Sequence, residues 1–352
     1  MPLITTCIGA YPKPDYVPTP DWFRTAPTEG NATRAFQRYL ENAPSDIDAI
    51  HDRGTRDVVQ AQIALGIDIP TDGEIRRENY IYYQCRNFTG FDFDNLTTRS
   101  LRNGAWVADV PTIVGPITPR EPILPRDFRV AQAATDKPVK MTLPGPMTIA
   151  GSTADAYYHD EATLGAALAK AINAEVLALA KAGCTWIQLD EPVFARSPDK
   201  ALAFGFDNLE RCFDGVPATV TRTVHMCCGY PQHLDQEAYL KADQNVYFQL
   251  AAAIDDSTIE AISLEDAHRY NDLRLLEAFR KTKVIFGSVA IARSRVEPVE
   301  EIAARLQAAL QHVDAERLLV APDCGLGYLS ESLVRAKLSN MVEAARSVGL
   351  GV

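Results

Sequence analysis

Short apolar segments alternate with longer amphipathic segments from about residue 138 to the end of the chain. This alternation constrains the fold more than any other feature, because the short segments have the length and β-branched composition of buried strands and the long ones have helical periodicity. The strands are predicted at 138–146, 184–192, 218–228, 260–266, 284–291 and 317–325. The helices are predicted at 161–183, 198–213, 238–254, 271–281, 297–313 and 330–349. Strands that alternate with crossover helices pair in parallel, with the helices outside the sheet.

Two further strands are predicted nearer the N-terminus, at 3–10 and at 67–74, the second after a helix at 46–66. Eight strands indicate a single (β/α)₈ barrel, an α/β fold that would span residues 1–352 as one domain. A doubly wound sheet is the alternative, but no G-x-G-x-x-G follows the first strand. Residues 76–135 fit neither element type. Their aromatic and turn residues predict an inserted excursion with hairpins.

Composition excludes several classes of protein. The net charge of −11 disfavours a nucleic-acid partner, because phosphate binding needs a basic surface. No run of about 18 apolar residues predicts a membrane span, and the N-terminus lacks a signal-peptide layout. A cytoplasmic protein is therefore expected. The seven cysteines are an odd number, which argues against a disulfide framework, and adjacent Cys227 and Cys228 lack the C-x-x-C spacing of a redox pair.

Polar residues collect where the predicted strands end. The carboxyl ends of barrel strands carry the chemistry in this fold, because all of them meet at one face. Acids, thiols and one histidine occupy these ends, in the sequences Ile8-Gly9-Ala10, Gly73-Glu74, Asp190-Glu191, His225-Met226-Cys227-Cys228, Glu265-Asp266 and Asp323-Cys324-Gly325. An ordinary core strand does not end this way, so these ends predict a functional site.

Four of these residues form a set suited to a metal ion. His225 and Cys227 are two apart on a strand and share a face, whereas Cys228 points to the opposite one. Glu265 and Cys324 end other strands of the same barrel and would lie at the same height. Each residue alone also fits a structural role, as a buried thiol, a satisfied histidine or a helix-capping acid. Together, the N, S, S and O donors favour zinc over magnesium or calcium.

Three segments resemble the zinc-site motifs of cobalamin-independent methionine synthases, a (β/α)₈-barrel family. They are "TVHMCCG", "ISLEDAHR" and "APDCGLG", in this order. "TTCIGAYPKP", "DGE", "LPGPMTI" and "IQLDEP" are similar to further segments of that family, so the resemblance covers nearly the whole chain except parts of 76–135. It implies one Zn²⁺ per chain with His225, Cys227, Glu265 and Cys324 as ligands. Only the catalytic barrel of the longer family members is matched.

The resemblance also implies the reaction and the substrate site. Family members methylate the thiol of homocysteine to give methionine, with zinc stabilising the substrate sulfur as a thiolate. The amino-acid end would be held by the backbone of Ile8, Gly9 and Ala10 and by the carboxylates of Glu74 and Asp190. Ala10 replaces the usual serine, so a backbone contact survives and a hydroxyl contact does not. The alternative role for the two acids is salt bridging in the barrel mouth. No catalytic residue is assigned beyond the zinc site.

The methyl-donor side departs from the family pattern. Ser152 stands where the family has a folate-stacking tryptophan, and Ala292 stands where it has a histidine thought to protonate the leaving folate. Tyr157 and Tyr158 are candidates to stack on a ring instead. A methyl-corrinoid leaves without needing a proton, so the two changes favour methylcobalamin or a corrinoid protein over methyl-tetrahydrofolate as the donor.

Three functions stay open at this point. The first is a zinc-dependent methyltransferase that acts on homocysteine or a similar small thiol. The second is alkylation of another thiol, such as the epoxide opening of the epoxyalkane:coenzyme M transferases. A sulfonate-bearing thiol would need cations around its tail, and Glu74 and Asp190 favour an ammonium instead. The third is a structural zinc site, which the displaceable carboxylate of Glu265 at an exposed strand end disfavours.

Overall fold

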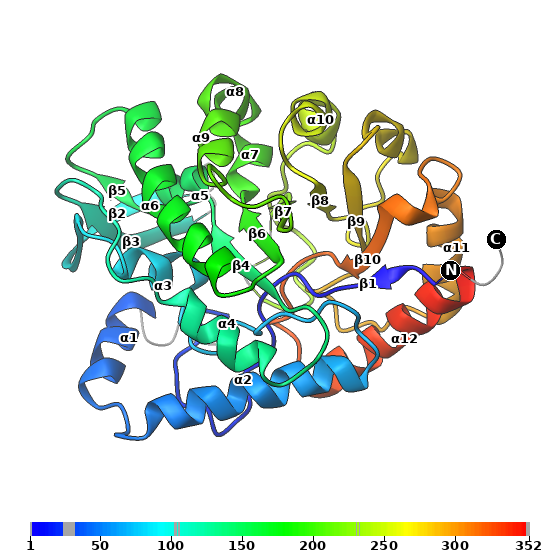
Figure 1. Cartoon of the computed structure of the whole chain (residues 1–352), viewed down its shortest axis with the longest axis horizontal. Coiled ribbons are helices and arrows are strands. Elements are labelled where there is room, and N and C mark those ends of the chain that lie inside the picture. The colour runs from blue at the N-terminus through cyan, green and yellow to red at the C-terminus, as the bar shows by residue number, and fades with distance from the viewer. Residues whose placement is uncertain are drawn as a thin grey trace.

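The computed structural model describes residues 2–23, 32–101, 104, 106–229, 231 and 233–349, and its centre is a curled parallel sheet (Figure 1). Seven strands follow the order β1-β10-β9-β8-β7-β6-β4, and every neighbouring pair is parallel. The strands are β1 (Ile4–Thr5), β4 (Lys140–Pro144), β6 (Trp186–Asp190), β7 (Thr221–Met226), β8 (Ala261–Leu264), β9 (Lys283–Val289) and β10 (Leu318–Pro322).

Residues 69–71 close the sheet into a barrel. Isolated parallel bridges join Thr6 to Ile69 and Thr71 to Lys140, so this segment lies between β1 and β4. The strand predicted at 67–74 is therefore present only as two bridges. Pro70 has no N–H to offer a neighbouring strand, and Gly73 turns the chain with a φ of 69°. The predicted (β/α)₈ barrel is confirmed. At one of its eight strand positions, only this short bridged segment is present.

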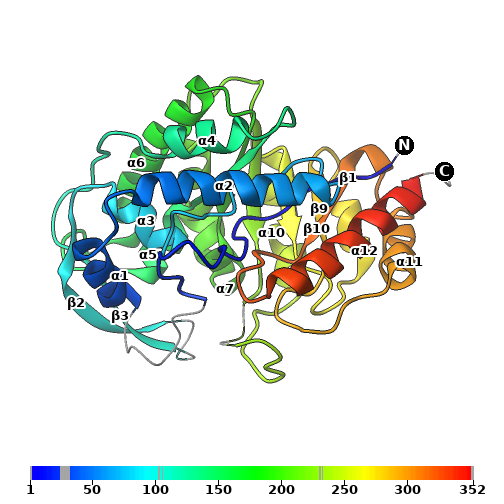
Figure 2. The same ribbon diagram turned by 90° about the horizontal axis from the view of Figure 1, so that it is seen from below.

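Helices cover the outside of the barrel, and Figure 2 shows α2 and α12 crossing it on one side. The long ones are α2 (Ile47–Ala64), α6 (Glu161–Lys181), α11 (Val299–Ala309) and α12 (Glu331–Gly349). α6 begins where the Asp160 side chain accepts from the Thr163 N–H at 2.7 Å, and Gly183 follows its end with a φ of 99°. Of the described helices, only α6 is long and apolar enough to cross a membrane by composition, yet half of the apolar stretch is buried against the barrel.

Three predicted helices differ from the structure. The helix predicted at 238–254 begins only at Val246 (α10, Val246–Asp256), because the preceding loop turns inward and the Ala242 N–H donates to the Cys228 carbonyl at 2.9 Å. The helix predicted at 271–281 is a 3₁₀ helix, η3 (Leu273–Ala278). The one predicted at 198–213 is divided into α8 (Pro198–Lys200), the π-helical η2 (Ala201–Gly205) and α9 (Phe206–Arg211).

The region 76–135 contains the predicted excursion. β2 (Phe91–Leu101) and β3 (Trp106–Ile113) form an antiparallel hairpin, and β5 (Ala154–Asp155) adds to β3 in parallel. Figure 1 shows this small sheet at the edge of the molecule farthest from α11. Further helices are α1 (Ala32–Glu41), which the sequence analysis did not assign, α3 (Tyr80–Arg86), α4 (Leu124–Gln132), α5 (Pro146–Ser152) and α7 (Pro192–Arg196). That residues 1–352 form one domain stays a prediction.

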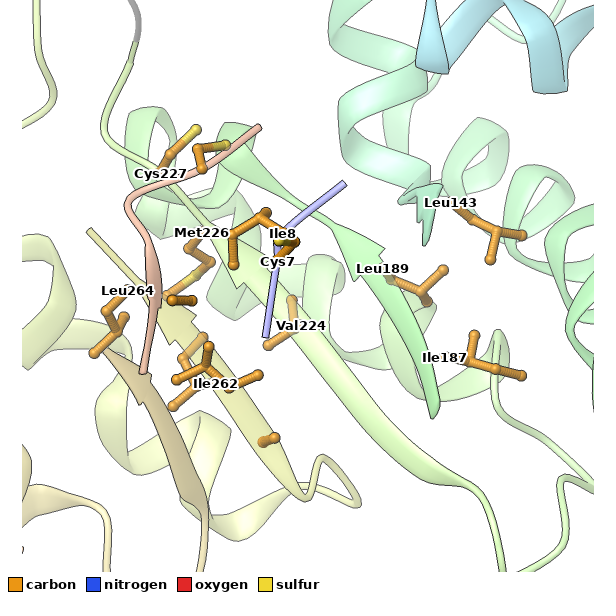
Figure 3. Packing of buried hydrophobic residues seen from close by; sticks show 14 of the residues in the cluster. Cys7, Ile8, Leu143, Ile187, Leu189, Val224, Met226, Cys227, Ile262 and Leu264 are labelled. Carbon is orange, nitrogen blue, oxygen red and sulfur yellow. The ribbon is translucent and has the colours of Figure 1, made fainter. Parts of the chain in front are cut away.

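Side chains of β4, β6, β7 and β8 alternate between an apolar and a polar set. Leu143, Leu189, Val224 and Leu264 are buried apolar residues of four successive strands, and Figure 3 shows Val224, Met226 and Cys227 in order along and just beyond β7. The residues between them face the barrel interior, because successive side chains of a strand point to opposite sides. The interior set is polar and comprises Lys140, Thr142, Gln188, Asp190, Thr223, His225 and Ser263. The barrel axis therefore holds a polar column that leads to the strand ends.

Candidate active site

A cavity of about 1290 Å³ opens at the carboxyl ends of the strands. Its floor includes residues that end or follow β1, β6, β7 and β10, and its outer wall includes α5 and the β2–β3 hairpin. Of the predicted site residues, all except Glu265 line this one cavity: Ile8, Gly9, Ala10, Glu74, Asp190, His225, Cys227 and Cys324.

Three of the four predicted metal ligands form a cluster. The ligand atoms of His225, Cys227 and Cys324 all lie within 4.8 Å of one another. The His225 Nε2 is 2.7 Å from the Cys324 Sγ, and its Nδ1 is 2.9 Å from the Ser263 Oγ on β8. The serine therefore fixes the ring so that Nε2 faces the two sulfur atoms, as the outer partner of a metal-binding histidine does.

The cluster is electrostatically suited to a thiolate. Burial would raise the pKa of the Cys227 thiol, but the hydrogen bond and charge of His225, with Arg196 and Lys241 farther off, lower it below its ordinary value. Burial would lower the pKa of His225, yet Cys227 and Asp190 raise it. A buried set of one nitrogen and two sulfur donors fits zinc and not a hard cation. These three residues would hold the ion.

Glu265 lies next to the cluster but is engaged elsewhere. Its Oε1 accepts from the Lys241 Nζ at 2.6 Å, and its Oε2 accepts from the Cys228 N–H at 3.2 Å. Burial raises the pKa of this carboxyl, and the Lys241 ammonium opposes that rise. Sequence reasoning missed Lys241, because it placed this residue in a helix, and nothing in the local pattern indicates that the loop turns inward.

The Cys228 side chain takes no part in the cluster, as the strand alternation predicts. It is buried, and burial together with the Glu265 charge raises the pKa of its thiol to about 12. A thiol in that state is inert.

The turn after β1 closely approaches the acid on the neighbouring segment. A Cβ added to Gly9 would lie 2.7 Å from the Glu74 Oε1, so no larger residue fits there without moving that carboxylate. The Ala10 carbonyl accepts from the Leu326 N–H at 2.7 Å, and the Tyr11 N–H donates to the Gly73 carbonyl at 3.0 Å. These bonds join the turn to the loops on both sides of it.

Glu74 and Asp190 are the two carboxylates beside the cluster. The Glu74 Oε1 accepts from the Thr142 Oγ1 at 2.8 Å and from the Arg77 Nη1 at 3.4 Å. The Asp190 Oδ1 accepts from the Gln188 Nε2 at 2.7 Å. Burial raises the pKa of Asp190 to about 7, with the Glu74 charge contributing and His225 opposing. The salt-bridge alternative therefore applies in part to Glu74, whereas the hydrogen bond described for Asp190 comes from an uncharged amide.

The donor side differs from the prediction in its aromatic residues. Ser152 lines the cavity, whereas Tyr157, Tyr158 and Ala292 do not. The Ala292 N–H donates to the His268 Nε2 at 3.2 Å. Trp22 and Phe23, which the sequence analysis passed over, line the cavity with ring centroids 4.2 Å apart. They lie in a segment without periodicity, so no sequence signal indicated them.

Two other acids at strand ends are structural. Asp323 accepts from the backbone N–H groups of Asp266, Ala267 and His268 and pairs with the His268 ring at 2.6 Å. Glu191 accepts from the N–H groups of Met147 and Thr148 at the start of α5. Both carboxylates fix loops around the cavity and have little capacity left for a ligand.

The fold and the site define an α/β barrel whose strand ends could hold a soft metal ion beside a carboxylate-lined pocket. Residues 3–347 match the family model described as the catalytic domain of cobalamin-independent synthase, and the chain belongs to that family. The resemblance found in the sequence motifs is thereby confirmed.

Individual relatives agree with this assignment. The methionine synthase of Thermococcus kodakarensis is 30% identical over 351 residues, which are 98% of this chain and 93% of that protein. That of Saccharolobus solfataricus is 30% identical over 354 residues, 99% and 96% of the two chains. The structure of a B12-independent methionine synthase from Shewanella sp. W3-18-1, in complex with selenomethionine, superposes with a TM-score of 0.86 at 29% identity and covers 99% of this chain and 98% of its own.

Proposed function

We propose that this protein is a zinc-dependent methyltransferase that converts homocysteine to methionine. One observation carries the proposal: a single cavity places the zinc-type donors of His225, Cys227 and Cys324 beside the carboxylates of Glu74 and Asp190. The names of the relatives support the same reaction. Glu265 completes the proposed ligand set of one zinc per chain, which requires it to leave Lys241.

The residues of the chain have distinct roles in this reaction. When bound, zinc supplies the Lewis acidity that keeps a substrate thiol deprotonated at neutral pH. Glu74 and Asp190 accept hydrogen bonds from the substrate ammonium and so aim its sulfur at the cluster. The turn at Ile8, Gly9 and Ala10 holds the same end of the substrate by its backbone. The sulfur then forms a bond to the methyl carbon as the bond from that carbon to the donor breaks.

The cavity supports a reduced folate as the methyl donor. Trp22 and Phe23 offer the aromatic surface that Ser152 does not, and ring stacking of this kind suits a pterin. The family is described as cobalamin-independent, and the Shewanella relative as B12-independent. The corrinoid donor expected from the sequence therefore becomes the second candidate. It is favoured by Ala292, which offers no proton to a leaving folate nitrogen.

The competing functions fit the cavity less well. An epoxide-opening enzyme for a sulfonated thiol would need cations where Glu74 and Asp190 stand. A purely structural zinc would be closed off by its ligands, whereas His225, Cys227 and Cys324 all line the open cavity.

The test is a side-by-side assay of the zinc-loaded protein with homocysteine and either methyl-tetrahydrofolate or methylcobalamin, with methionine as the readout. We expect methionine from at least one donor and faster formation from the folate. Faster turnover with methylcobalamin would establish the second candidate. X-ray absorption at the zinc edge should show an added sulfur ligand with homocysteine, and an unchanged spectrum at saturating thiol would contradict the proposed function.

A further inference from the structure

We propose that Gln188 is a positioning residue that joins the two halves of the homocysteine amine site, and that the buried ammonium of Lys140 selects the orientation of its amide. The inference rests on the proposed function, because it concerns how that substrate's ammonium is recognised. It assigns a role to two interior residues, Gln188 and Lys140, that neither bind the metal nor line the cavity.

Gln188 bridges two parts of the site that are far apart in the sequence. Its side chain is fully buried on β6 and points into the barrel. The Nε2 donates to the Ile8 carbonyl at 2.9 Å and to the Asp190 Oδ1 at 2.7 Å. One amide group therefore connects the turn after β1 to the carboxylate that ends β6. With Oδ1 accepting from Gln188, Asp190 has its second carboxylate oxygen to offer to a substrate ammonium.

The other end of this amide lies among buried polar atoms without partners. The Gln188 Oε1, the Lys140 Nζ and the Thr223 Oγ1 have no hydrogen-bond partner among the residues that the structure describes. They lie on the neighbouring strands β6, β4 and β7, and Gln188 is directly paired in register with Thr223. Each of the three residues is fully buried. Such unsatisfied groups lower stability, so their presence on three neighbouring strands of the barrel interior calls for an explanation.

Lys140 has the chemistry that the free oxygen of Gln188 requires. An ammonium only donates, and a carbonyl oxygen only accepts, so one water molecule between them would satisfy both groups. Lys140 pairs in register with Trp186, two residues before Gln188 on β6, so it lies nearer the amino ends of the strands than Gln188 does. Its charge acts on both Asp190 and His225. Burial lowers the pKa of Lys140 to about 8, so it stays protonated at neutral pH.

This arrangement fixes which way the Gln188 amide faces. A glutamine amide can turn by half a rotation and exchange its oxygen for its nitrogen at little cost. Here a donor-only group lies below it, and two acceptors, the Ile8 carbonyl and the Asp190 carboxylate, lie above it. The NH₂ group must therefore face upward. Lys140 therefore affects the substrate site through the orientation of the Gln188 amide, without contacting the substrate.

The test compares two thiols that differ only in the amine. Homocysteine and the mercaptobutyrate that lacks its amino group are titrated calorimetrically into the zinc-loaded protein. We expect the wild-type protein to prefer homocysteine, and Gln188→Met to reduce that preference about tenfold, mainly through homocysteine. Gln188→Glu keeps an acceptor for Lys140 but places a charge against Asp190. It should therefore reduce the preference further while the melting temperature holds or rises.

A matched control separates positioning from general packing. Gln62 is also fully buried, but its amide donates to the carbonyls of Val58 and Thr71, and neither of these residues lines the cavity. Gln62→Met should lower the melting temperature and leave the preference between the thiols unchanged. Zinc content is measured for every variant and should stay at the wild-type level. Lys140→Met replaces the ammonium by an apolar group of similar length. It should reduce the preference for homocysteine about threefold without loss of stability. This variant tests the proposal if Gln188→Met does not fold.

The two possible failures are distinguishable. If the wild-type protein binds both thiols equally, the amine site fails, and the proposed function and the positioning role are contradicted together. If the wild-type protein discriminates and the Gln188 and Lys140 variants discriminate equally well, only the positioning role is contradicted.

Discussion

The cavity has two sides, and they are built in different ways. On the thiol side, each of three polar side chains is hydrogen-bonded to a strand residue. His225 is bonded to Ser263 of β8, Glu74 to Thr142 of β4, and Asp190 to Gln188 of its own strand β6. On the donor side, the wall consists of α5, the β2–β3 hairpin and the segment with Trp22 and Phe23. It is tied together by long side chains, as when Arg99 of β2 donates to the Thr153 carbonyl and the Tyr82 hydroxyl donates to the Ser152 carbonyl at 3.0 Å.

The difference shows where the fold itself provides precision. Strand ends of a parallel barrel are placed by backbone ladders, so their side chains meet at a fixed height. A hairpin and a loop are placed by side-chain contacts that can be exchanged one at a time. Substitutions on the thiol side should therefore weaken metal or substrate binding strongly, and those on the donor side should change the donor affinity only slightly.

The largest effect is expected for the metal cluster. Cys227→Ser and Cys324→Ser should each lower zinc affinity by more than about a hundredfold, because a hard hydroxyl replaces a soft thiolate. Zinc content after dialysis against a chelator is the measurement. Cys228→Ser is the matched control and should retain its zinc, because this thiol lies outside the cluster. Wild-type zinc content in both of the first two variants would remove the basis of the thiol side.

The next effect concerns the substrate ammonium. Asp190→Asn keeps the size of the side chain and removes its charge, so a charge-assisted hydrogen bond is lost. We expect the KM for homocysteine to rise about 10- to 100-fold with either donor. The KM of the methyl donor should change little, because Asp190 lies on the thiol side. Steady-state kinetics with each substrate varied in turn measures both values. Equal rises in the two would show that the sides are not independent.

The same contrast explains how much could be predicted from sequence. His225 and Cys227 share a strand face, and Cys324 ends another strand, so spacing and topology together placed all three at one site. Trp22 and Lys241 were missed because they lie in segments without periodicity, where only tertiary contacts determine the path. Residues 67–74 were assigned a full strand because their apolar alternation is real, but Pro70 and the turn at Gly73 shorten it. Strand ends are predictable from pattern, whereas long loops are not.

A pH dependence is expected on the thiol side. The pKa of Asp190 is raised to about 7, and only its carboxylate form can accept from the substrate ammonium. Protonation therefore removes the interaction as the pH falls, and the KM for homocysteine should rise towards tenfold per pH unit below about 7. In Asp190→Asn the KM should be high and nearly constant over the same range. If the wild-type KM for homocysteine stays constant from about pH 5.5 to about pH 7, where this carboxylate should titrate, then the carboxylate does not bind the amine.

The smallest effect is expected on the donor side, at Trp22. Its ring lines the cavity, and the adjacent Phe23 ring supports it at a centroid distance of 4.2 Å. Trp22→Ala removes a stacking surface, so the KM for methyl-tetrahydrofolate should rise about three- to tenfold while that for homocysteine stays the same. Tyr157→Ala is the control, because Tyr157 is an exposed aromatic residue outside the cavity lining. A change in the homocysteine KM alone would place Trp22 on the thiol side, because only a residue that contacts the amino-acid substrate or its ligands could produce it. An unchanged folate KM would mean that the donor binds elsewhere along the hairpin wall.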